Sequence, residues 1–171
     1  MTKAVGAAAI LLGCCLAALC RVRAKKARIG ELCSARDSLM QLRRELADRR
    51  CDLAEVFLRL AGQYEGKRTG VFFNRLCEEM EALGEKRFAE IWRAASWEVF
   101  ESLDANAAEM IGALGGFLGG SELEPQCAAL ERAAREMERL AQTEREALGG
   151  ERRMSYGISL SAGALIVIML I

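Results

Sequence analysis

The apolar residues of this chain follow two patterns, an uncharged run at each end and a helical periodicity between the ends. Residues 4–20 and residues 156–171 contain no charged side chain. Between them, apolar residues recur every three or four positions, which is the spacing of an amphipathic helix. The pattern predicts an all-α protein, a membrane-anchored helical bundle with one transmembrane helix at each end.

Basic residues beside the first run predict its orientation. As a helix, the run is about 25 Å long, slightly short of the roughly 30 Å hydrocarbon core of a bilayer. Only Lys3 precedes it, whereas five basic residues follow it: Arg21, Arg23, Lys25, Lys26 and Arg28. Because positively charged flanks stay in the cytoplasm, we expect a transmembrane helix over residues 1–22 with the following segment cytoplasmic.

The second run has the same polarity. Arg152 and Arg153 precede it, and Tyr156 suits the interface between membrane and water. We expect a transmembrane helix over residues 151–171 and a cytoplasmic helical bundle over residues 23–150. The alternative is a buried C-terminal core helix, although this run has no polar face to offer water.

Two kinds of processing signal compete with an uncleaved N-terminal anchor. A cleaved signal peptide carries its positive charges before the apolar run rather than after it. The stretch from Leu11 to Cys14 also has the form of a lipoprotein cleavage site. A chain starting at Cys14 would still begin with apolar residues and a basic cluster, so the uncleaved anchor is the better interpretation.

A leucine heptad runs through residues 27–61. Its members are Leu32, Leu39, Leu46, Leu53 and Leu60. The heptad predicts the core face of antiparallel helices, with a dimeric coiled coil as the alternative. The polar stretch 48–52 interrupts the heptad, so this region is either two helices or one long helix with a polar segment in its middle.

Further helices follow the heptad. Turn residues between Gly62 and Gly70 predict a break, after which Thr69 could cap a helix. Around residues 88–99, the spacing predicts that Trp92 faces the core and that Trp97, on another side, is a candidate for a helix–helix or partner contact.

Glycines gather at the end of the next predicted helix, residues 103–118. They are Gly112, Gly115, Gly116, Gly119 and Gly120. Glycine permits close helix packing and ends helices, and no lysine follows to make a phosphate-binding loop. Ser121 to Glu124 then form a capping box for a last charged helix, with Pro125 in its first turn.

Composition narrows the possible chemistry. The chain has 24 basic and 24 acidic residues and no histidine, so neither a nucleic-acid partner nor the commonest general base is indicated. Its 7 cysteines include no C-x-x-C pair, so neither a metal site nor another cofactor is expected. Exposed basic residues Arg43, Arg44, Arg49 and Arg50 are candidates for contacts with a partner or with lipid headgroups.

Several blocks of this sequence resemble the stage III sporulation protein AB family. They are Leu39-x-x-Leu42-x-x-Glu45-Leu46, Ala89-Glu90-Ile91-Trp92, and Leu114-Gly115-x-x-Leu118-Gly119-x-x-Glu122-x-x-x-Gln126. The resemblance extends over nearly the whole chain. The family usually has Asp at the position of Glu122 and Pro near Asp52, so this chain departs from its pattern at both. We interpret the last block mainly as a folding determinant.

The resemblance implies a non-enzymatic part of the sporulation channel complex that joins the mother cell to the forespore. The family's cytoplasmic domain is similar to that of the inner-membrane platform proteins of type II secretion and type IV pilus machines. The implied partners are a secretion-type ATPase, resembling stage III sporulation protein AA, other membrane subunits of the channel, and membrane lipid. The implied location is the mother-cell membrane around the forespore, crossed twice.

Two other function classes remain open. A membrane enzyme would need an acid–base or nucleophile set without histidine, and none of the body's cysteines has a nearby base. A self-associating membrane scaffold or pore-forming helical hairpin, independent of an ATPase, is compatible with the leucine heptad and the small residues in the apolar runs.

Overall fold

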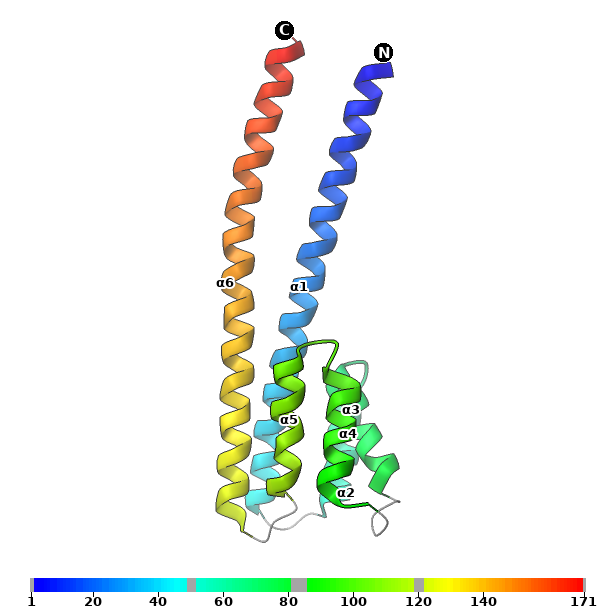
Figure 1. The fold of residues 1–171 in the computed structure, drawn as a ribbon, viewed down its shortest axis with the longest axis vertical. Coiled ribbons are helices and arrows are strands. Elements are labelled where there is room, and N and C mark those ends of the chain that lie inside the picture. The colour runs from blue at the N-terminus through cyan, green and yellow to red at the C-terminus, as the bar shows by residue number, and fades with distance from the viewer. Residues whose placement is uncertain (1, 49–51, 81–85, 119–121, 171) are drawn as a thin grey trace. The chain divides into compact units, whose positions relative to one another are not determined.

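The structure is a computed structural model that describes residues 2–48, 52–80, 86–118 and 122–170. Within these ranges it contains six helices, and the prediction of an all-α protein is confirmed (Figure 1). The helices are α1 (Thr2–Asp48), α2 (Leu53–Gln63), α3 (Arg68–Glu79), α4 (Phe88–Phe100), α5 (Ala105–Leu118) and α6 (Leu123–Leu170).

The chain divides into two compact units. Residues 30–140 form one, which we call the body. Residues 1–29 and 141–171 form the other, which we call the end unit. In the end unit, Arg28 on α1 forms an ion pair with Glu144 on α6, with 3.2 Å between Nε and Oε1.

The apolar runs belong to α1 and α6 by backbone, but most of their side chains lie outside the described residues. Among the described residues, no helix is long and apolar enough to cross a bilayer.

The polar stretch 48–52 separates two helices. Helix α1 ends at Asp48 and α2 begins at Leu53, which decides between the two alternatives left by the sequence. Asp52 is the N-cap of α2, and its carboxylate accepts a hydrogen bond from the Ala54 N–H at 3.4 Å. A side-chain acceptor at this position satisfies one of the free N–H groups of the first turn.

The leucine heptad lies largely inside the body. Leu32, Leu39 and Leu60 are each at most 2% exposed within a single chain. Leu46 and Leu53, on either side of the break, are partly exposed. Burial of the three leucines in one chain favours the core face of packed helices over a dimeric coiled coil.

An aromatic cluster fills the space between α2, α3 and α4. Trp92 lies at its centre, fully buried as predicted, with ring centroids 5.0 Å from Phe72 and 5.9 Å from Phe57. Phe73 and Phe100 are also buried and contact the same rings. Aromatic rings bury the largest apolar areas of any side chain, so this cluster dominates the energetics of the body.

Close packing of α5 on α4 requires glycine. A Cβ at Gly115 would lie 2.8 Å from the Cβ of Trp92, and one at Gly112 would lie 2.8 Å from the Ser96 Oγ. The predicted role of the glycines in helix packing is therefore confirmed for these two. Helix α5 ends at Leu118, and Gly119, Gly120 and Ser121 lie outside the described residues.

The start of α3 differs from the prediction. Thr69 does not cap it, because α3 begins at Arg68 and Lys67 is the N-cap, without a side-chain hydrogen bond. Gly70 is helical rather than part of the turn, and a Cβ there would lie 2.3 Å from the Tyr64 carbonyl oxygen. The turn itself contains Gly66, whose φ of 76° is in the left-handed region that glycine tolerates.

Candidate docking surface

The exposed side of α4 carries the predicted contact residue Trp97. Helical residues three, four or seven positions apart lie on one side of a helix. Trp97 shares its side with Glu90, Arg93, Ala94 and Glu101, all of which are exposed. We call these five residues the α4 outer face.

The two tryptophans of α4 have opposite environments, as predicted. The Trp92 indole is fully buried and donates a hydrogen bond to the Ile111 carbonyl oxygen at 2.6 Å. Trp97 is partly exposed, and the structure shows no hydrogen bond from its indole to any described residue. A partly exposed tryptophan on a helix side surrounded by polar residues suits a protein contact, since tryptophan is enriched among the residues that dominate interfaces.

Some charges near Trp97 are already paired within the chain. The Arg87 guanidinium, 2.7 Å from the Glu90 carboxylate, lowers the pKa of Glu90. Glu98 pairs with Arg75 on α3 at 3.2 Å. By contrast, Arg93 and Glu101 form no ion pair with any residue that the structure describes, so their charges are available to a partner.

The predicted basic candidates on α1 have different environments. Arg43 is partly exposed and pairs with Glu131 on α6, with 3.7 Å between Nη2 and Oε2. Arg44 is exposed and makes no ion pair with the described residues. Arg49 and Arg50 lie outside the described residues. Among these four arginines, Arg44 is therefore the one that the structure describes as exposed and without an ion pair to the described residues, so it is the best candidate for a partner contact.

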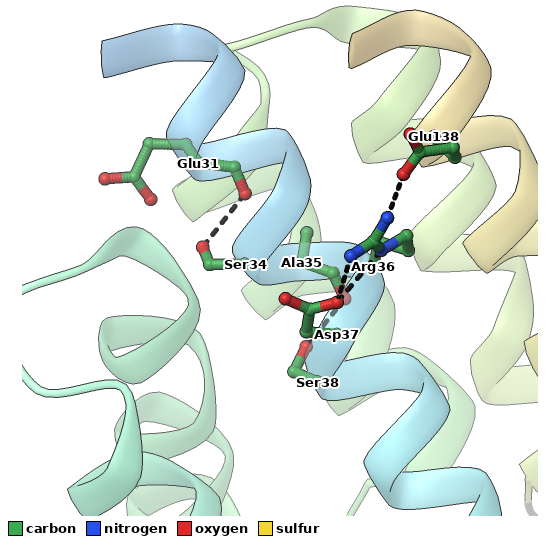
Figure 2. A network of polar contacts seen from close by, with 7 residues as sticks. All are labelled: Glu31, Ser34, Ala35, Arg36, Asp37, Ser38 and Glu138. Atoms are coloured by element: carbon green, nitrogen blue, oxygen red, sulfur yellow. Dashed lines mark hydrogen bonds and ion pairs between the residues drawn. The ribbon is translucent and has the colours of Figure 1, made fainter. Parts of the chain in front are cut away.

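A second ion pair joins α1 to α6 inside the body. In Figure 2, the Arg36 guanidinium extends from α1 and contacts both Asp37 on its own helix and Glu138 on α6. The hydrogen bond to Asp37 is the largest cause that raises the pKa of Arg36 above its ordinary value. Together with Arg43–Glu131, this pair fixes the alignment of the two helices in the body.

A polar junction links α1, α3 and α4. The Glu31 carboxylate accepts a hydrogen bond from the Arg68 backbone N–H at 3.0 Å, and so caps α3 from a distant helix. The Arg68 guanidinium donates to the Val99 carbonyl at 2.9 Å and to the Ser102 hydroxyl at 2.7 Å. The buried hydroxyls of Ser34 and Thr69 lie 3.0 Å apart in a hydrogen bond.

This junction shows why Thr69 is not a cap. Its hydroxyl is fully buried against α1, and the N–H at the start of α3 is bonded by Glu31 instead. Ser34 also donates to the Glu31 carbonyl oxygen at 2.9 Å, as Figure 2 shows. Sequence reasoning missed Glu31 and Arg68, because a cap supplied 37 residues away leaves no local pattern.

We expect Glu31→Ala to lower the free energy of unfolding by about 1 kcal/mol, since removal of a capping acceptor typically has this effect. Glu31→Gln keeps an acceptor oxygen and should lose less. Chemical denaturation of both variants checks this, and equal stability of Glu31→Ala and the parent chain would contradict the capping role.

The family block identified in the sequence divides between core and surface. Leu114, Gly115, Leu118 and Gln126 are buried, which agrees with a role in folding. Glu122 is exposed, and Gly119 lies outside the described residues. Gly115 packs against Trp92, so this block is in contact with the family block that ends at Trp92.

The described residues offer little to a chemical reaction. Among them, no three Cys, Asp or Glu side chains are grouped so as to hold a metal ion. Burial raises the pKa of the Cys77 thiol, which disfavours the reactive thiolate. The exposed charges and Trp97 on α4 suit recognition of another macromolecule instead.

The fold and this surface define the class of protein: a helical bundle whose candidate site is a docking surface. A comparison with protein families matches residues 3–171 to stage III sporulation protein AB (spore_III_AB), and the chain belongs to this family. The resemblance found in the sequence is thus confirmed, and the chain is a stage III sporulation protein rather than a member of a known enzyme family. No curated protein and no solved structure matches it.

Proposed function

We propose that this chain is a non-enzymatic membrane component of the sporulation channel complex between mother cell and forespore, where it docks a secretion-type ATPase. Membership of the sporulation family over residues 3–171 is the observation that carries this proposal. The ATPase and the channel come from the resemblance of the family to secretion platform proteins.

Membrane attachment is part of the proposal and rests on the sequence. Residues 4–20 and 156–171 are uncharged, and each run has basic residues on the side of the body. Two transmembrane helices with this polarity would leave the body in the mother-cell cytoplasm, where a cytoplasmic ATPase could reach it.

The surface of the body supports a contact mechanism. Arg44 offers an exposed cation on α1, and the α4 outer face offers Trp97 between the unpaired charges of Arg93 and Glu101. A partly buried aromatic anchor with a polar rim is the usual arrangement of an interface. We therefore propose that the ATPase contacts one or both of these regions.

Charge reversal at Arg44, Arg49 and Arg50 is expected to weaken ATPase binding about tenfold, because a surface charge pair typically contributes up to about 1 kcal/mol. The measurement is co-elution of residues 27–148 with the secretion-type ATPase from the same genome. A matched control is charge reversal at Lys67, Lys86 and Arg132, three other exposed cations of the body.

Circular dichroism should first establish that each fragment is helical. Unchanged binding by the Arg44, Arg49 and Arg50 variant would remove these residues from the proposal. No binding by a helical parent fragment would favour the second candidate, a self-associating scaffold, which size measurement of the full chain in detergent would then test.

A further inference from the structure

The charges of this chain are divided unequally between its two units. The end unit has nine basic and three acidic residues, a net charge of +6. The body has 15 basic and 21 acidic residues, a net charge of −6. The overall charge of zero therefore hides a separation of opposite charges, and such asymmetry indicates an interaction with a charged surface.

Three exposed cations in the end unit make no polar contact with the residues that the structure describes. Arg21, Arg23 and Lys26 are exposed on α1 and make no ion pair or hydrogen bond with the described residues. Arg28, by contrast, is paired with Glu144 at 3.2 Å. Successive helical residues are about 100° apart, so Arg23 and Lys26, three positions apart, lie on one side of α1 and Arg21 lies on the opposite side. We call these three cations the collar.

Exposed apolar side chains precede the collar on the same helix. Leu16 is 61% exposed and Leu19 is 56% exposed. An apolar helix surface followed directly by basic residues suits the boundary between acyl chains and headgroups, where arginine and lysine extend toward phosphate.

We propose that Arg21, Arg23 and Lys26 bind the headgroups of anionic phospholipids, so that this chain selects anionic over neutral lipid. The proposal rests on the membrane attachment put forward above and names the lipid class that the attachment uses. Basic residues near the surface of an anionic bilayer are attracted to its headgroups, so the collar favours an anionic over a neutral bilayer.

The test uses the full chain, purified in a neutral detergent and mixed with equal amounts of phosphatidylglycerol and phosphatidylcholine. After repurification, mass spectrometry gives the ratio of the two lipids that remain bound. We expect the parent chain to be enriched roughly fivefold in phosphatidylglycerol. Substitution of Arg21, Arg23 and Lys26 by Gln should bring the ratio close to one.

The matched control replaces three exposed cations of the body, Lys67, Lys86 and Arg132, by Gln. It changes the total charge equally and should keep the enrichment. A parent ratio near one, or equal loss of enrichment in both variants, would overturn the inference.

Flotation with pure phosphatidylcholine vesicles tests attachment separately. A chain that floats but shows no lipid preference would overturn the inference alone. A chain that does not float would overturn the membrane attachment and the inference with it.

Discussion

Replacement of Trp92 by alanine is expected to lower the free energy of unfolding by about 3–5 kcal/mol, which is the usual effect of deleting a large buried aromatic side chain. Trp92 is fully buried and contacts the rings of Phe57 and Phe72. The substitution also removes the indole hydrogen bond to the Ile111 carbonyl. A cavity between α2, α3 and α4 would remain, because helices on three sides cannot all move inward.

Trp97→Ala is the matched control, since it makes the same truncation on the same helix. Trp97 is partly exposed and has no hydrogen bond to the described residues, so we expect a loss of about 1 kcal/mol or less. Urea denaturation of the two variants measures the difference. Similar losses for both would mean that the assignment of one tryptophan to the core and one to the surface is wrong.

This control also connects stability with function. If the α4 outer face binds the ATPase, Trp97→Ala should weaken binding while the body stays folded. Exposed aromatic anchors typically contribute about 2 kcal/mol or more to an interface, which corresponds to a loss of affinity of roughly thirtyfold. Binding equal to that of the parent chain would direct attention to Arg44 and its neighbours.

Periodicity predicted the helices well because their apolar spacing is regular. The spacing around Trp92 and Trp97 assigned the two side chains to different sides of one helix, and both assignments agree with the structure. The polar stretch 48–52 left the number of helices open, because a polar segment is compatible with both a solvated helix and a break. Asp52, as an N-cap, accounts for the break.

Contacts between distant segments could not be predicted in the same way. Thr69 had the residue type of a cap, but its hydroxyl bonds to Ser34 on α1, and Glu31 supplies the acceptor instead. Gly70 had the residue type of a turn, yet it lies within α3, where the Tyr64 carbonyl comes too close for any residue with a Cβ. In both cases, a neighbour in space decides between roles that one residue type can fill.

The contacts of the candidate docking residues could not be predicted from the sequence either. Arg43 and Arg44 are adjacent in the sequence and chemically identical, but only Arg43 lies near a carboxylate of α6 in the described structure. The sequence predicted an exposed basic group, and it could not separate the arginine that aligns two helices from the one that remains open to a partner.

Gly115 and Gly116 are expected to respond to alanine with opposite signs. A Cβ at Gly115 would lie 2.8 Å from the Trp92 Cβ and 3.0 Å from its ring, whereas a Cβ at Gly116 would have no neighbour within 4 Å. Forced overpacking typically costs about 1–3 kcal/mol, so Gly115→Ala should destabilise the body. Gly116→Ala should stabilise it by about 0.5–1 kcal/mol, because alanine loses less backbone entropy in a helix.

The pair isolates packing from helix propensity, since both residues belong to α5 and both substitutions add one methyl group. Thermal or urea denaturation of the two variants gives the two signs. Stabilisation by both would mean that α5 can move away from α4 at little cost. Destabilisation by Gly115→Ala alone would instead show that the block containing Leu114 and Gly115 acts through the contact with Trp92, so that a buried glycine sets the position of α5 against α4, the helix that carries Trp97.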